Sequence, residues 1–259
     1  MLNLLAADVI ERFYAFMWPM LRISALMLTA PILSQNAINT RMRILLALVL
    51  TWLVYPLHQW PRLAPVSAQG LLQIFNQIGI RALMCLVRQM VVAAVVVGGQ
   101  SISSAMGLSM ASMIDPNLGN VPVLSQFLLV LASLVFVGFG GHAILLGLVS
   151  ESFYTLPIGA PILSQAVLGK LVQWSSMMFL GGLLLALPVM VFLLFVNVGL
   201  GNVTPAAPRL NIFAVGFPAM VLAGFLVLIV SMDSIGARID WLWMQAFGVL
   251  RDLTGVSHV

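Results

Sequence analysis

Long apolar stretches with almost no charged residues dominate the pattern along this chain. Asp, Glu, Lys and Arg are absent from residues 23–40, 44–61, 63–80, 89–114, 116–150, 152–169, 171–208 and 210–232. A helix that crosses a bilayer needs about 20 mainly apolar residues, and lipid cannot hydrogen-bond a bare backbone. The pattern therefore predicts helices over residues 9–33, 44–58, 70–113, 122–150, 168–202 and 211–232.

Glycines and prolines interrupt several of these segments. The segment 70–113 is too long for one crossing, and Gly79, Gly98-Gly99 or Gly107 could each mark a break in it. Proline lacks an amide hydrogen and kinks a helix, so neighbouring protein must satisfy the carbonyl that it frees. We therefore expect helix breaks and close packing against other protein helices at Pro19, Pro188, Gly216 and Pro218.

The last segment predicts an amphipathic helix over residues 235–253. One helical stripe is formed by the apolar residues at positions 235, 239, 242, 246, 249, 250 and 253, and the charged residues lie mostly off it. Trp241 and Trp243 belong to the same segment. A stripe of this kind with tryptophans is typical of a helix at a membrane interface or on a partner protein.

The composition narrows the class of protein. Apolar residues make up 62% of the 259 residues and charged residues only 7%, with a net charge of +4. A soluble domain is roughly 45–50% apolar and about 25% charged, so soluble enzymes and nucleic-acid-binding modules are excluded. The single cysteine, Cys85, excludes an intrachain disulfide framework, and the three histidines have no metal-binding spacing. We therefore expect no metal and no cofactor.

Charged side chains inside the apolar segments are candidates for functional positions. Arg22 follows a run of apolar residues, and Arg81 and Arg88 lie seven residues apart on one helix face. A charge deep in hydrocarbon is costly and usually faces protein or water. Arg22 and Arg88 are therefore candidates for a buried charge or a subunit contact, with snorkelling to the membrane surface as the equal alternative. For Arg81 we favour snorkelling.

Polar residues between 100 and 109 permit two interpretations. The serines and Gln100 are small or polar, which favours close helix packing over a transport path. A serine hydrolase that pairs one of these serines with His142 is disfavoured, because the chain has no GxSxG motif and no nearby acid to orient the histidine. We therefore expect no enzymatic activity.

Several short motifs, in order, resemble the FliR family of type III export-gate membrane proteins over nearly the whole chain. They are Trp18-Pro19-Met20-Leu21-Arg22, Thr29-Ala30-Pro31-Ile32-Leu33-Ser34, the run from Gly107 to Pro116, Val121-Pro122-Val123-Leu124, Gly140-Gly141-His142, Phe153-Tyr154-Thr155-Leu156-Pro157-Ile158-Gly159, Pro208-Arg209-Leu210-Asn211-Ile212-Phe213 and Gly216-Phe217-Pro218. Members of the family often have Asn-Gly-His where this chain has Gly140-Gly141-His142, so the resemblance assigns no role to the first of these positions.

The resemblance implies a fold and a set of partners. It implies an all-α polytopic membrane protein whose bent or broken helical hairpins pack into a larger helical export-gate assembly with FliP and FliQ. FlhB would contact this core and FlhA would lie nearby. The assembly would conduct unfolded flagellar proteins from the bacterial inner membrane, at the flagellar basal body, and part of it would be raised towards the periplasm. No nucleic acid is implied.

The resemblance also divides the chain and places a channel plug in it. It implies a single membrane domain, with a FliP- and FliQ-like first part over residues 1–122, further hairpins over 123–232 and the amphipathic segment at 233–259. The plug corresponds to residues 106–122, and the residues expected to form the seal and its turn are Met106, Leu108, Met110, Met113, Ile114, Asp115 and Pro116. Methionine is flexible, which suits a deformable hydrophobic seal, although ordinary helix packing also explains such a cluster. Asp115-Pro116 would end the preceding helix.

Three alternative functions remain open at this point. A virulence-type secretion system uses an equivalent export-gate subunit. A secondary transporter with broken helices would use Arg22 or Arg88 as a charge partner, although related halves are not evident in the chain. A structural scaffold within a secretion complex would have no channel-lining role.

Overall fold

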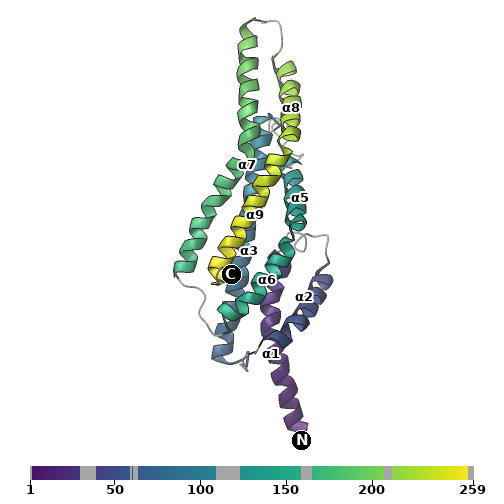
Figure 1. The fold of residues 1–259 in the computed structure, drawn as a ribbon, viewed down its shortest axis with the longest axis vertical. Helices are drawn as coiled ribbons and strands as arrows, with labels where there is room; N and C mark the ends of the chain where they lie inside the picture. The colour runs from purple at the N-terminus through teal and green to yellow at the C-terminus, as the bar shows by residue number, and fades with distance from the viewer. Residues whose placement is uncertain are drawn as a thin grey trace. The chain divides into compact units, whose positions relative to one another are not determined.

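The fold is helical throughout the residues described here. A computed structural model describes residues 2–29, 39–58, 60, 64–108, 123–158, 165–206 and 212–255. The α-helices in these ranges, together with the 3-10 turn η1, are α1 (Leu2–Thr29), α2 (Thr40–Val54), η1 (Tyr55–Leu57), α3 (Ala68–Ala105), α5 (Val123–Gly138), α6 (Gly141–Thr155), α7 (Gln165–Ala206), α8 (Ile212–Val230) and α9 (Met232–Thr254) (Figure 1).

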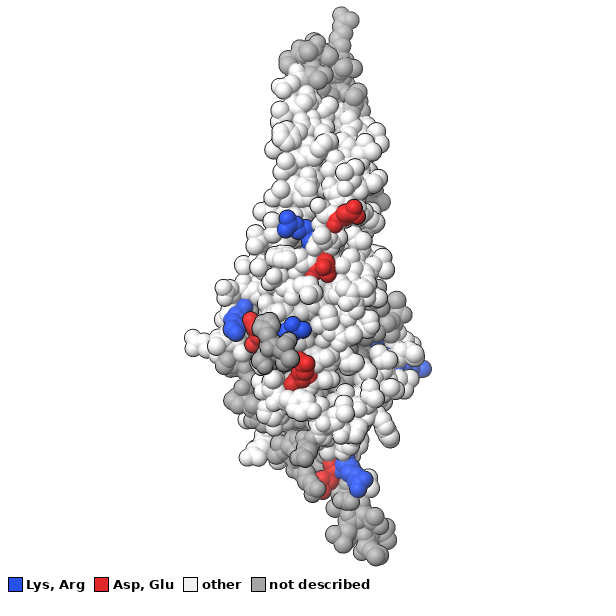
Figure 2. All heavy atoms as spheres, in the orientation of Figure 1, with Lys and Arg blue, Asp and Glu red and all other residues white. Residues whose placement is uncertain are grey.

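Several helices have the length and composition of membrane spans. Within the described ranges these are Thr40–Leu57, Ala68–Ala105 and Gln165–Asn202. The number rises to five if each of two bent helix pairs, α5 with α6 and α8 with α9, is one span. On the face drawn in Figure 2 most of the surface is uncharged, and the few acidic and basic residues on it lie near one another in small groups. The predicted fold class, an all-α polytopic membrane protein with bent helices, is confirmed.

The long segment predicted over residues 70–113 breaks at only one of its candidate glycines. Helix α3 runs without interruption past Gly79 and the pair Gly98-Gly99 to Ala105. The chain then turns at Gly107, whose φ of +77° lies in the left-handed region that glycine adopts at little cost.

The prediction of one helix over residues 122–150 is wrong. Helix α5 ends at Gly138, α6 begins at Gly141, and the two are bent by 65°. Gly140, with φ +73°, makes the turn, which a residue with a side chain would make under strain. A Cβ on Gly141 would lie 2.6 Å from a ring carbon of Phe136, so both glycines are needed at this break.

The chain divides into two compact units that alternate along the sequence. The first contains residues 1–89, 136–174 and 245–259, and the second contains residues 90–135 and 175–244. The division of the chain into three consecutive parts, which rests on the family resemblance, stays a prediction.

In the first unit, α1 packs against α2 and α6 around a core of apolar side chains. The rings of Phe136, Phe139 and Phe247 are mutually 5.9–6.1 Å apart, which joins the helix break to the C-terminal part of α9. The Thr155 hydroxyl donates to the Thr254 carbonyl at 2.7 Å, so the ends of α6 and α9 are also joined by a hydrogen bond.

In the second unit, helices approach α3 closely enough for backbone contact. A Cβ on Gly98 would lie 3.0 Å from the Gly182 carbonyl oxygen of α7, and a Cβ on Gly182 would lie 2.8 Å from the Ala94 oxygen. A Cβ on Gly99 would lie 2.6 Å from Cα of Ser125 in α5. Small residues at such crossings bring backbones together where apolar burial alone gives no driving force. Gly98-Gly99 is therefore a packing site and not a helix break.

The amphipathic helix predicted at 235–253 is confirmed as α9, but its environment differs from the expectation. Its stripe is buried within the chain itself, at Ile235, Ile239, Leu242, Ala246, Leu250 and Leu253. In the second unit Trp243 Nε1 donates to the Ala132 carbonyl at 3.2 Å, and the side chain of Leu242 packs on Gly181. The interfacial or partner-binding role assigned to this stripe is therefore wrong.

We expect Gly99→Ala to destabilise the protein by about 1–3 kcal/mol, because the new methyl group would overlap the backbone of Ser125. The measurement is the thermal unfolding midpoint in a mild detergent. Gly199→Ala in α7 is the matched control, since nothing lies within 4 Å of its Cβ position. Equal midpoints for the two variants would contradict the close contact between α3 and α5.

Candidate functional site at the end of α3 and around Arg22

The structure describes only the beginning of the predicted plug. Met106 and Leu108 lie within the described residues, at the end of α3. The other expected plug residues, Met110, Met113, Ile114, Asp115 and Pro116, lie outside them. Their role in sealing a channel therefore stays a prediction.

A glycine turn ends α3 just before the plug. The Leu108 N–H donates to the Ser103 carbonyl at 3.1 Å, and the Gly107 N–H donates to the Ser104 carbonyl at 3.0 Å. This pair of hydrogen bonds around a left-handed glycine is the Schellman motif, which satisfies the last carbonyls of a helix. Gly107 therefore ends α3, and the helix end expected at Asp115-Pro116 lies outside the described residues.

Met106 is fixed in the second unit immediately before this turn. Its side chain is fully buried, and a Cβ on Gly224 of α8 would come within 2.5–2.8 Å of its Cγ, Cε and Sδ atoms. The ring of Phe217, also from α8, lies 3.6 Å from the Cβ position of Gly107. The start of the predicted plug therefore packs against α8, where Gly224 has no side chain and leaves room for Met106.

Arg22 of α1 forms a buried polar cluster in the first unit. Its Nε donates to the Gln77 side-chain oxygen of α3 at 2.9 Å. Its Nη1 donates to the carbonyl and the hydroxyl of Ser152 of α6 at 2.7 and 3.3 Å. Its Nη2 donates to the Leu156 carbonyl at 2.9 Å. One planar side chain therefore joins α1, α3 and the end of α6.

The Arg22 cluster excludes one of the two interpretations left open by the sequence, and a subunit contact through Arg22 stays a prediction. The guanidinium is fully buried, so it does not snorkel, and every acceptor that it contacts belongs to this chain. The central guanidinium carbon of Arg22, Cζ, also lies 4.6 Å from the centre of the Phe153 ring, which is a cation–π distance. Within the described residues Arg22 is an internal brace. Sequence reasoning missed Gln77 and Ser152, whose only signal was a polar residue in an apolar helix.

The other arginine candidate is less enclosed. Arg88 of α3 is half-buried, and its Nη2 donates to the side chain of the adjacent Gln89 at 3.2 Å. Arg81 is also half-buried. A subunit contact through Arg88 stays a prediction.

The predicted break positions lie inside continuous helices. Pro19 is buried in α1, Pro188 is half-buried in α7, and α8 contains a buried Gly216 and an exposed Pro218. None of the four ends its helix. The helix breaks expected at these positions are therefore wrong, and the close packing against other protein helices expected there stays a prediction.

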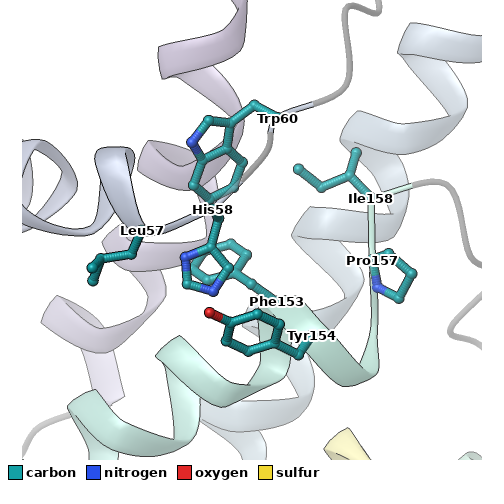
Figure 3. Close-up of a pocket in the computed structure, with 7 residues that line it drawn as sticks. All are labelled: Leu57, His58, Trp60, Phe153, Tyr154, Pro157 and Ile158. Atoms are coloured by element: carbon teal, nitrogen blue, oxygen red, sulfur yellow. The ribbon is translucent and has the colours of Figure 1, made fainter.

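An open pocket of about 620 Å³ lies beside the Arg22 cluster in the first unit (Figure 3). It is lined by Leu57, His58, Trp60, Phe153, Tyr154, Pro157 and Ile158. Phe153 belongs to both features, because its ring contacts Arg22 and forms part of the pocket wall. Over the described residues, no group of three or more His, Cys, Asp or Glu side chains is placed to hold a metal ion.

The fold and these sites define an all-helical membrane protein with internal polar and glycine contacts. The sequence matches the family described as "Bacterial export proteins, family 1" over residues 13–246. It is 37% identical to the flagellar biosynthetic protein FliR of Pectobacterium carotovorum subsp. carotovorum, over 98% of this chain and 97% of that protein. It is 36% identical to FliR of Escherichia coli K12 over 92% of each chain, and 29% identical to FliR of Bacillus subtilis over 97% and 99%.

The chain therefore belongs to this family of bacterial export proteins, together with the FliR proteins. This confirms the resemblance found in the motifs.

We expect Arg22→Lys to lower the free energy of unfolding by about 2 kcal/mol, because an ammonium cannot reach Gln77, Ser152 and Leu156 together as the guanidinium does. Arg238→Lys, at an exposed position of α9, is the control with the same chemical change. Thermal unfolding in detergent compares the two. A midpoint for Arg22→Lys that matches the control would show that the cluster contributes little.

Proposed function

We propose that this chain is a core subunit of the flagellar type III export gate. With FliP and FliQ it forms the channel through which unfolded flagellar proteins leave the cell. The observation that carries the proposal is the similarity to proteins named flagellar biosynthetic protein FliR over almost the full length of both chains. The family is described as one of bacterial export proteins, which supports transport rather than catalysis, so the subunit is no enzyme and needs no cofactor.

The surface of the described helices suits an assembly within a membrane. Helices α7 and α8 expose many large apolar side chains, among them Phe179, Leu194, Phe195, Leu222, Leu226 and Ile229. In water such a surface is unfavourable, so lipid or other helices must cover it. Contacts with FliP, FliQ and FlhB would cover part of it, with FlhA as a neighbour. The location that follows is the inner membrane at the flagellar basal body, with part of the assembly raised towards the periplasm.

The segment that follows Met106 is the proposed plug. The buried Met106 and the Gly107 turn fix the start of a segment that continues with Met110 and Met113. A fixed start lets the segment stay attached to α3 and α8 while its centre parts around an extended polypeptide. Flexible apolar side chains close such a constriction by excluding water.

Replacing Met110 and Met113 together with glycine is expected to make the membrane permeable to small ions, because the constriction would lose most of its apolar volume. The measurement is the ion conductance of the purified gate complex in planar bilayers. The variant with leucine at both positions keeps the apolar volume and should stay closed. Conductance of the glycine variant equal to that of the leucine variant would rule out these methionines as the seal.

Three other functions compete with this proposal. An equivalent subunit of a virulence secretion system shares the architecture, but the relatives named here are flagellar proteins. A broken-helix transporter would use Arg22 as a charge partner, yet Arg22 is enclosed by acceptors of its own chain. A scaffold without a channel-lining role is separated from the proposal by the conductance experiment.

Deleting the gene is expected to abolish swimming, and the full-length chain purified in mild detergent should carry FliP- and FliQ-like subunits with it. Motility assays and mass analysis of the purified complex are the two measurements. A complementing copy of the gene is the control for the deletion. A motile deletion strain that loses secretion of virulence factors would support the injectisome alternative. A stable monomer without companions would support a transporter.

A further inference from the structure

The pocket between the end of α2 and the end of α6 has an aromatic lining and a polar centre. Leu57 and His58 follow α2, and Phe153 and Tyr154 come from the last turn of α6. Figure 3 shows the His58 imidazole between the side chains of Trp60 and Tyr154. The ring centres of Trp60, Phe153 and Tyr154 lie 5.6, 5.4 and 4.3 Å from that of His58. These contacts hold the imidazole at a fixed place in the wall.

The imidazole has no hydrogen-bond partner at either nitrogen within the part of the chain that the structure describes. Both Nδ1 and Nε2 of His58 are buried atoms without a donor or acceptor in reach. A buried polar atom left in this state costs roughly 1–3 kcal/mol. The Tyr154 side chain that covers the imidazole is 70% exposed, so moving it aside breaks its ring contact with His58 and opens the imidazole to the pocket. A ligand in the pocket could then satisfy His58.

The positive charge of Arg22 beside the pocket determines whether a ligand there is an anion or a cation. Arg22 lies 4.6 Å from the centre of Phe153, and its hydrogen-bond acceptors are two carbonyls, a hydroxyl and an amide oxygen, all neutral. The positive charge of Arg22 is therefore not cancelled by the side chains that bind it. Aromatic walls alone would suit a cation. The arginine behind one of these walls makes the pocket favour an anionic group instead.

The pocket lies at the ends of candidate membrane spans, and this position indicates the source of the anion. The candidate span Thr40–Leu57 ends at the first residue of the pocket, and α6, part of another candidate span, ends at Thr155 beside it. Tryptophan and tyrosine gather at the level of lipid headgroups, where Trp60 and Tyr154 would then lie. We propose that this pocket binds the phosphate of an anionic phospholipid headgroup, with His58 as hydrogen-bond donor and Arg22 as the neighbouring positive charge.

An apolar side chain from a partner protein fits the pocket less well. It would match the aromatic walls, but it would leave both His58 nitrogens without a partner and the Arg22 charge without an anion. A phosphate oxygen accepts from His58 and interacts favourably with the arginine, while the acyl chains of the lipid remain in the bilayer. This binding does not depend on the proposed channel.

The test is a lipid titration of the full chain, purified in mild detergent with whatever subunits accompany it, followed by native mass spectrometry. Phosphatidylglycerol is the probe, diacylglycerol lacks the phosphate, and glycerol phosphate lacks the acyl chains. His58→Phe keeps the ring and removes both nitrogens, and we expect it to weaken phosphatidylglycerol binding about tenfold, as the loss of one hydrogen bond to a charged group does. His142→Phe is the matched control, since His142 is exposed on α6 outside the pocket.

The outcomes separate the possible occupants. Tight binding of phosphatidylglycerol in the wild type and in His142→Phe, with the loss in His58→Phe and little binding of diacylglycerol, supports the proposal. If glycerol phosphate binds as tightly as phosphatidylglycerol, the ligand is a free phosphate compound and the proposal of a lipid ligand is overturned. Unchanged lipid binding in His58→Phe overturns the site. Loss of an accompanying subunit, rather than of lipid, in His58→Phe also overturns it and assigns the pocket to a protein partner.

Discussion

A buried guanidinium that cannot reach water organises the first unit of this protein. Arg22 needs acceptors for its N–H groups, and the chain supplies them from Gln77 on α3, Ser152 on α6 and the carbonyl of Leu156. Removing one partner of a buried charge typically costs roughly 3–5 kcal/mol, so these helices cannot separate without a large penalty. The acceptors that the described residues supply are all neutral, so the cluster fixes the position of α1 while the charge of Arg22 has no carboxylate partner among them.

The second unit solves the same packing problem without a charge. In apolar surroundings, burial of more apolar surface gives helices no preference for one another over lipid. Gly98, Gly99 and Gly182 remove the side chains at the crossing points, so α3 meets α5 and α7 at backbone distance. The Ser125 hydroxyl donates to the Val96 carbonyl at 3.1 Å across one of these crossings. A buried charge with its acceptors thus specifies one unit, and close steric fit supported by neutral hydrogen bonds specifies the other.

The sequence predicted the helices well because lipid permits few alternatives. Missing charges mark the apolar segments, and an uninterrupted backbone in them must be helical. It could not tell which glycine breaks a helix. Gly107 and Gly140 turn the chain, whereas Gly98 and Gly99 serve packing, and the difference lies in neighbours that are distant in sequence. Gln77 and Ser152 were missed for the same reason, because they are distant in sequence from Arg22. Arg22 itself was recognised as a candidate from the apolar residues around it in the sequence.

The stripe of α9 shows a further limit of patterns along one helix. An apolar face with two tryptophans fits a membrane surface, a partner or the interior of its own chain equally well, because all three present an apolar environment. In this protein the apolar stripe of α9 is buried in the interior of its own chain. Trp243 donates its N–H to the Ala132 carbonyl within the second unit. Large apolar side chains remain exposed to lipid and partners on other helices instead, among them α2, α3, α5, α7 and α8. On α7 this apolar surface is interrupted by exposed polar side chains, among them Lys170, Gln173 and Asn197. These polar positions, together with the shape of the apolar surface, give an assembly the means to select one register.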